Sequence, residues 1–142
     1  MIKVKRIDHV AIAVRDRDGS CDALRGLFGL DPGAREHVAG QKTDVAFLHT
    51  DQAAEAAIEL IAPAGNDGLE RFLDKRGPGL HHICFEVDDL PATLASLKAA
   101  GVRLIDDVPR PGARGHQVAF LHPASTGGVL FELCASPHGA KA

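Results

Sequence analysis

Two histidines and two glutamates of the sequence recur at one fixed spacing. His9 precedes Glu59 by 50 residues, and His82 precedes Glu132 by the same 50 residues. Each lies inside a short apolar stretch of the kind that forms β-strands, where a carboxylate without a partner is costly to bury. Imidazole nitrogen and carboxylate oxygen together suit first-row divalent ions such as Co²⁺, Ni²⁺, Mn²⁺, Fe²⁺ or Zn²⁺. The spacing therefore predicts one divalent metal site that takes a His and a Glu from each half of the chain.

Each of these side chains also has a simpler interpretation. Taken singly, a strand histidine is more often a packed or surface residue than a metal ligand. A glutamate such as Glu59 in "IEL" can point to solvent while its neighbours are buried. The repeated spacing favours the metal over these alternatives. Cys84 and Cys134 lie two residues beyond His82 and Glu132, and we interpret them as small buried residues.

A repeated pentapeptide gives the offset that relates the two halves. "VAFLH" occurs at residues 45–49 and again at 118–122, and the same offset of 73 places "DHVAIAVRD" on "HHICFEVDD". We interpret this as a duplicated β-α-β-β-β module. The first module is expected over residues 7–63, the linker over 64–79 and the second module over 80–135.

The predicted fold class is α+β. Two tandem modules in a single domain, residues 1–142, are expected to form a curved mixed sheet around the metal site, because one module alone could bury little core. In each module a helix should follow the first strand and begin at Asp16 or Asp89, and a further short helix is expected over 68–75. The strands are expected at 7–14, 34–39, 43–49 and 56–62, then at 80–87, 102–107, 116–122 and 128–134.

Composition argues against several classes of function. The formal net charge is −3, no basic stripe is present and both Trp and Tyr are absent, so nucleic acid is not an expected partner. No apolar stretch approaches the roughly 18 residues of a membrane span, and the N-terminus lacks the pattern of a signal peptide. The three cysteines show no Cys-x-x-Cys spacing, which argues against a disulfide framework. We therefore expect a cytoplasmic protein.

Beyond these patterns, the sequence resembles the vicinal oxygen chelate (glyoxalase/bleomycin resistance) superfamily, whose members pair β-α-β-β-β modules around one metal. The segments "FLDKRGPGLHHICFEVDDL" and "VAFLHPASTGGVLFEL" are similar to the methylmalonyl-CoA epimerases within it. The resemblance implies metal ligands at His9, Glu59, His82 and Glu132, with Co²⁺ favoured. It also implies an isomerase that interconverts (2R)- and (2S)-methylmalonyl-CoA through an enolate, after a base removes the proton at C2.

The resemblance further implies roles for individual residues. Glu132 is expected to be one catalytic base in addition to binding the metal. Some family members carry a Glu on the strand that corresponds to "QKTDVAFLH", where the nearest acid is Asp44, so Asp44 is the candidate second base. Arg114, in "PGARGHQ", is the candidate contact for the substrate carboxylate or a CoA phosphate. A solvated surface position is the alternative for both Asp44 and Arg114. An acyl-CoA substrate and a homodimer are expected from the family alone.

Three other kinds of protein share the expected fold. A glyoxalase I-type lactoylglutathione lyase uses similar metal chemistry, but the "VAFLHP" and "GGVLFEL" segments favour the epimerase. A non-catalytic small-molecule-binding protein of the same fold tends to lack the four metal ligands. A ring-cleaving dioxygenase uses two His and one carboxylate and leaves positions open for O₂.

Overall fold

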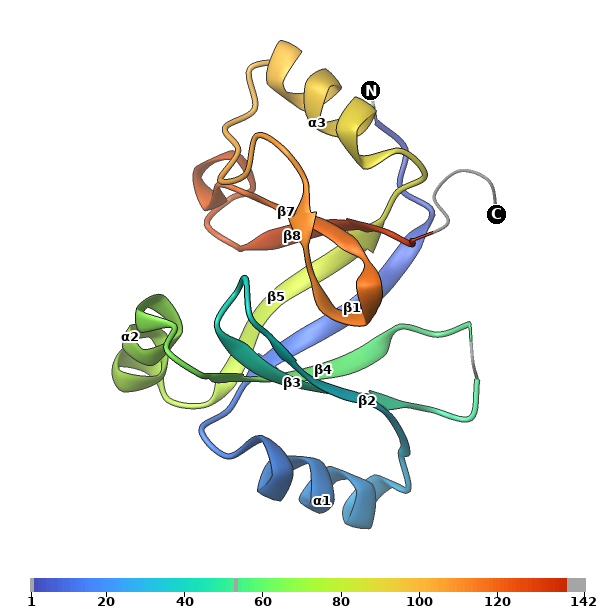
Figure 1. The fold of residues 1–142 in the computed structure, drawn as a ribbon, viewed down its shortest axis with the longest axis vertical. Coiled ribbons are helices and arrows are strands. Elements are labelled where there is room, and N and C mark those ends of the chain that lie inside the picture. The colour runs from blue at the N-terminus through green and yellow to red at the C-terminus, as the bar shows by residue number, and fades with distance from the viewer. Residues whose placement is uncertain (1, 53, 138–142) are drawn as a thin grey trace. The chain divides into compact units, whose positions relative to one another are not determined.

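The computed structural model of the protein describes residues 2–52 and 54–137 (Figure 1). The chain divides into two compact units, and each has its own core. The N-terminal unit is His9–His81. The C-terminal unit runs from His82 onward and also includes the residues up to Asp8.

The N-terminal unit is a mixed sheet with two helices (Figure 1). Strand β1 runs parallel to β4, and β3 pairs antiparallel with both β2 and β4, which gives the order β2-β3-β4-β1. The predicted β-α-β-β-β order is therefore confirmed for the first copy, and the predicted short helix follows it. The elements are β1 (Arg6–Ala13), α1 (Arg17–Phe28), β2 (Asp31–Val38), β3 (Thr43–His49), β4 (Ala57–Pro63) and α2 (Asp67–Arg76).

The C-terminal unit repeats the same order of elements. Strand β5 runs parallel to β8, and β7 pairs antiparallel with β8 on one side and β6 on the other. The second β-α-β-β-β module is therefore confirmed as well. Its elements are β5 (Gly79–Glu86), α3 (Leu90–Ala99), β6 (Arg110–Pro111), β7 (Gln117–Leu121) and β8 (Phe131–Ala135), with short 3₁₀ turns at Ala113–Gly115 and Pro123–Ser125.

One predicted strand of the second module is wrong. Residues 102–107 form no continuous strand. Leu104 makes a single antiparallel bridge to Leu121 of β7, and the regular ladder on that side of β7 consists of the two residues of β6. The carboxylate of Asp106 accepts a hydrogen bond from the N–H of Phe120 at 2.8 Å, so a side chain takes the place of a backbone carbonyl. The prolines on either side of Arg110 have no N–H to donate, which also prevents a longer ladder.

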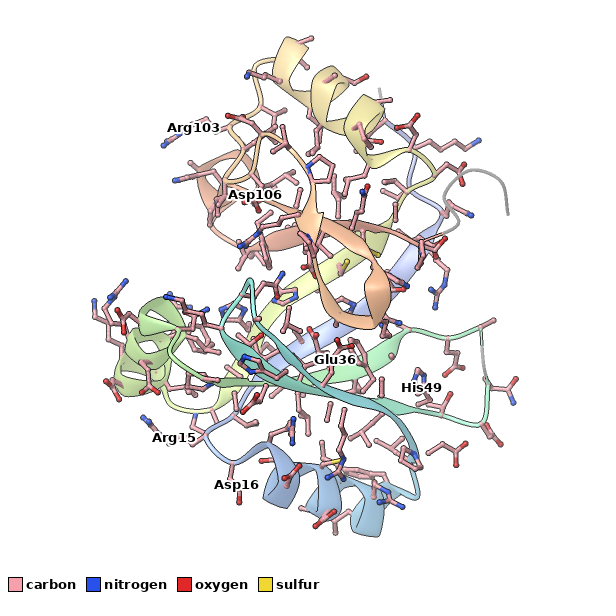
Figure 2. The ribbon with its side chains drawn as sticks, viewed as in Figure 1. Arg15, Asp16, Glu36, His49, Arg103 and Asp106 are labelled. Carbon is pink, nitrogen blue, oxygen red and sulfur yellow. The ribbon has the colours of Figure 1, made fainter. Side chains whose placement is uncertain are left out.

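Equivalent aspartates start the two module helices. Asp16, labelled at the start of α1 in Figure 2, accepts a hydrogen bond from the N–H of Gly19 at 3.0 Å. Asp89 does the same for α3, where it accepts from the N–H of Ala92 at 3.0 Å. Such a cap satisfies an N–H that the first helical turn leaves without a partner. Gly29 ends α1 in the left-handed conformation, with φ of 65°.

Each module helix packs on one face of its own sheet. In the N-terminal unit the core contains Cys21 of α1 together with Ala46 and Leu48 of β3. Helical spacing assigns Leu27 and Phe28 to the apolar side of α1, but they are 75% and 70% exposed. In the C-terminal unit the corresponding core members are Leu90, Leu94, Ala119, Leu121 and Leu133. Among the described residues, no helix is long and apolar enough to cross a membrane.

Candidate metal and catalytic site

In the N-terminal unit, the structure brings together the two predicted metal ligands. Nε2 of His9 lies 3.2 Å from Oε1 of Glu59, and both residues are buried. Ala11 is the register partner of Glu59 in the parallel pair of β1 and β4, so His9 and Glu59 are diagonal neighbours on one face of the sheet. The imidazole and the carboxylate therefore point to the same place.

The C-terminal unit contains the same arrangement. Nε2 of His82 lies 3.2 Å from Oε1 of Glu132, and both residues are again buried. Cys84 is the register partner of Glu132, in the place that Ala11 holds for Glu59. The sequence repeat is therefore also a repeat of side-chain geometry, with the same atoms at the same separation.

Beside each His–Glu pair lies an aromatic ring that sequence reasoning missed. Phe47 is the register partner of Glu59, and its ring meets that of His9 edge-on with centroids 5.7 Å apart. Phe120 is likewise the partner of Glu132, and its ring meets that of His82 edge-on at 5.2 Å. These phenylalanines are the "F" of the two "VAFLH" segments. Because the two pentapeptides are identical, their shared phenylalanine could have been recognised from the sequence.

The donors in each unit fit a divalent metal ion. Each pair offers one imidazole nitrogen and one carboxylate oxygen in a buried place, which is a mixed set that first-row divalent ions bind well. A buried carboxylate is stabilised by a nearby cation far more than by a neutral imidazole alone. Both pairs therefore have the chemistry that the metal prediction requires.

The structure does not bring Asp44 to the His9–Glu59 pair. Side chains alternate between the two faces of a strand, and Asp44 is an odd number of residues from Phe47 on β3. Oδ1 of Asp44 lies 2.8 Å from Nδ1 of His37, on the face opposite to Phe47. Asp44 therefore lies on the face away from the point where His9 and Glu59 converge, and its role as second base stays a prediction.

Arg114 lies in the C-terminal unit, where it is fixed by an acid that sequence reasoning missed. Its guanidinium donates a hydrogen bond to the carboxylate of Asp8, which is only 3% exposed, and Arg6 donates to the same carboxylate at 3.1 Å. The backbone of Arg114 has a φ of 59°, a conformation that residues other than glycine seldom adopt. Such a residue persists only where its surroundings hold it, which is common at functional sites.

Cys84 and Cys134 are buried, as predicted, and they influence each other's ionisation. Burial raises the pKa of the Cys84 thiol well above its ordinary value. A hydrogen bond with Cys84 lowers the pKa of the Cys134 thiol to about 7, against the opposing effect of its own burial. The two thiols therefore do not ionise independently of each other.

Comparison with known proteins places the chain in a family. The sequence profile of the Glyoxalase/Bleomycin resistance protein/Dioxygenase superfamily matches residues 8–120. The chain belongs to this superfamily. The predicted resemblance and the predicted paired-module fold are both confirmed by the match and by the order of the elements.

Several relatives within the superfamily are named as methylmalonyl-CoA epimerases. A mitochondrial methylmalonyl-CoA epimerase of Dictyostelium discoideum is 38% identical and covers 93% of this chain and 79% of its own length. An ethylmalonyl-CoA/methylmalonyl-CoA epimerase of Cereibacter sphaeroides is 37% identical and covers 92% of this chain and 97% of its own. A solved methylmalonyl-CoA epimerase in complex with methylmalonyl-CoA and NH₄⁺ superposes with a TM-score of 0.87 at 34% identity, covering 94% and 96% of the two chains.

Proposed function

We propose that this protein is a methylmalonyl-CoA epimerase, an isomerase that interconverts the (2R) and (2S) forms of methylmalonyl-CoA. The observation that carries the proposal is the duplicated buried His–Glu pair, in a chain of which several relatives over nearly the whole length bear that name. The alternatives of a lactoylglutathione lyase or a non-catalytic binding protein share the fold, but the relatives favour the epimerase.

We further propose that His9, Glu59, His82 and Glu132 together bind one divalent ion. Support comes from the identical atoms and separations in the two pairs and from the match to the superfamily. Co²⁺ is the first choice, with Ni²⁺, Mn²⁺, Zn²⁺ and Fe²⁺ as the other candidates. When bound, the ion supplies Lewis-acid stabilisation of the negative charge that develops on the thioester oxygen of the substrate.

Side chains of the protein are proposed to transfer the proton and to bind the substrate. Glu132 is proposed as a base that takes the C2 proton of one epimer, and its burial opposite Phe120 of β7 keeps water from competing for that proton. Arg114 is proposed to bind the substrate carboxylate or a CoA phosphate. The contact with Asp8 orients its guanidinium before the substrate arrives, which reduces the entropy lost on binding.

The organisation of the enzyme is proposed from its sequence and family. The two modules, over about residues 7–63 and 80–135, act as one domain joined by the linker 64–79. The enzyme works as a homodimer in the cytoplasm on a free acyl-CoA. Light scattering of the purified protein checks the oligomeric state, and a mass near twice 15.0 kDa is the expected result.

The proposed activity is tested by deuterium uptake. The protein is first stripped of metal, then incubated with each epimer of methylmalonyl-CoA in D₂O with and without added Co²⁺. Deuterium should enter at C2 and the second epimer should accumulate, both only when Co²⁺ is present. Ethylmalonyl-CoA is run in parallel, because one relative is named for both substrates.

The controls separate the competing activities. Glu132→Gln should abolish formation of the second epimer while the circular dichroism spectrum stays unchanged. A hemithioacetal of glutathione is offered as the substrate of the alternative lyase. Turnover of the hemithioacetal without exchange at C2 of methylmalonyl-CoA would show that the epimerase assignment is wrong.

A further inference from the structure

We propose that Glu36 of β2 is the second carboxylate that moves the C2 proton. The inference rests on the proposed epimerase function and deepens it. An epimerase removes a proton from one face of C2 and delivers one to the opposite face, so two groups placed on different sides of that carbon do this with least movement. With Asp44 on the face of β3 away from His9 and Glu59, a group on another strand of the N-terminal unit is better placed for this role.

The site face of β3 is identified by two independent contacts. Phe47 meets the ring of His9 and is the register partner of Glu59, so Phe47 lies on the site face. Val45 is two residues from Phe47 and therefore shares that face. Ala46 and Leu48 pack in the core that contains Cys21 of α1, which places them on the helix face.

The same reasoning on β2 puts Glu36 on the site face. Register partners in an antiparallel pair lie on the same face of the sheet, and Glu36 is the partner of Val45. Its two neighbours confirm the alternation. His37 contacts Asp44, and Arg35 donates a hydrogen bond to Sγ of Cys21 at 3.2 Å, so both lie on the helix face.

The distance between Glu36 and Glu59 suits a small acyl group. Glu36 is two strands away from Glu59 across β3 and two residues along it. With strands about 4.8 Å apart and a rise of about 3.4 Å per residue, their Cα atoms are about 12 Å apart on one face. Glu36 is half-buried and is labelled in Figure 2. It therefore combines access to a ligand with partial removal from water, which suits a proton-transfer group.

The proton transfer balances with two groups in opposite protonation states. The carboxylate of Glu36 takes the C2 proton from one face and becomes a carboxylic acid, while the electron pair of the C–H bond moves toward the thioester oxygen. A second group, for which Glu132 is proposed, delivers a proton to the opposite face of C2, so that one proton leaves the substrate and one returns. The other epimer reacts with the two roles exchanged.

The test compares epimerisation with exchange in the Glu36→Gln variant. In D₂O with Co²⁺, formation of the second epimer should fall at least about 100-fold from either starting epimer, since a general base contributes about that much or more. Exchange at C2 should persist for one epimer only, without inversion, because the remaining carboxylate still removes the proton on its own side. This asymmetry separates a proton-transfer group from a residue that merely supports the fold.

Matched variants make the outcome decisive. His37→Gln changes the adjacent residue on the opposite face and should keep the rates of epimerisation and exchange within about twofold. The proposal is overturned if Glu36→Gln epimerises within about threefold of the unchanged protein, or if it loses exchange equally with both epimers. If the unchanged protein itself neither exchanges nor epimerises, the proposed function fails before Glu36 is tested.

Discussion

The ring of Phe47 stands edge-on to the ring of His9, at an interplanar angle of 83°, and its strand neighbour across the sheet is Glu59. Phe120 holds the same relationship to His82, at 87°. An edge-to-face contact between a phenyl ring and an imidazole favours one orientation of that imidazole. The repeated strand therefore orients the histidine of each pair.

Replacing Phe47 by Leu should weaken metal binding more than it weakens the fold. Loss of the ring frees the imidazole of His9 to turn, and we expect Co²⁺ affinity to fall by about tenfold, the lower end for residues that orient a ligand. The free energy of unfolding should fall by only about 1 kcal/mol, because the substitution keeps an apolar side chain. Calorimetric titration with Co²⁺ and urea denaturation measure the two effects.

Phe131→Leu is the matched control for this prediction. Phe131 stacks on Phe85 at 5.5 Å, away from either histidine ring contact. It should lose stability without loss of Co²⁺ affinity. An equal loss of affinity in both variants would mean that the Phe47 ring has no particular effect on His9.

Co²⁺ should stabilise the metal-free protein against heat. At a free concentration about 100 times the dissociation constant, binding to the folded state alone adds about 2.7 kcal/mol. We expect His9→Ala and His82→Ala each to lose most of this gain, since one ion is proposed to use both pairs. Differential scanning calorimetry with and without Co²⁺ measures it. If His82→Ala retained the full shift, the two pairs would not share an ion.

Asp8→Asn should destabilise the protein strongly for a single change of charge. The substitution leaves the guanidinium of Arg114 beside a buried neutral amide, and breaking such a pair costs about 3–5 kcal/mol when fully buried. Arg114 and Arg6 retain some exposure, at 24% and 35%, so we expect about 2 kcal/mol. Urea denaturation measures the loss.

A surface aspartate provides the comparison for Asp8. Asp88 pairs with Lys5 at 3.1 Å, but its side chain is 62% exposed. Asp88→Asn should change the free energy of unfolding by no more than about 0.5 kcal/mol. Similar losses for Asp8→Asn and Asp88→Asn would indicate that the burial of Asp8 adds nothing.

The thiol pair predicts a specific dependence of stability on pH in the metal-free protein. The pKa of Cys134 is lowered to about 7 in the folded state. Its contribution to the free energy of unfolding is therefore present in full above the ordinary thiol pKa of 9.0 and is lost as the pH falls through about 7. The pKa of Cys84 is raised, so its effect is opposite and appears as a loss of stability above pH 9.0.

Cys134→Ser should remove the rise in stability between pH 7 and pH 9. Denaturation curves at several pH values, for the unchanged protein and the variant, measure the difference. We expect the two stability profiles to diverge as the pH rises through this window. Parallel profiles would show that Cys134 titrates alike in the folded and unfolded chains.

Sequence alone could predict the repeat, the paired modules and the two His–Glu pairs. These depend on local patterns such as alternating apolar residues, capping aspartates and the shared offset of 73, all of which can be read along the chain. It could not predict which acid of the β2–β3 hairpin shares a face of the sheet with Phe47. That depends on the turn, where Lys42 adopts a φ of 53°, a conformation that nothing in its residue type signals.

The sequence alone also could not predict contacts between residues that are far apart in the chain. Asp8 and Arg114 are 106 residues apart, and nothing in either local segment indicates that they meet. The failed strand at 102–107 had the right apolar pattern, but the carboxylate of Asp106 competes for the N–H that a neighbouring strand would use. Both failures come from tertiary contacts that overrule a reasonable local pattern.

The register of β2 against β3 has an evolutionary consequence. In-frame gain or loss of one codon between Val38 and Thr43 would favour a one-residue slip, and such a slip would exchange Glu36 for His37 on the face shared with Phe47. Upstream of Arg35, the irregular pairing that follows Pro32 can absorb the same event without moving the residues downstream. A one-codon deletion at the start of β2 is therefore nearly silent. The same deletion just after β2 replaces an acid with an imidazole on the face shared with Phe47.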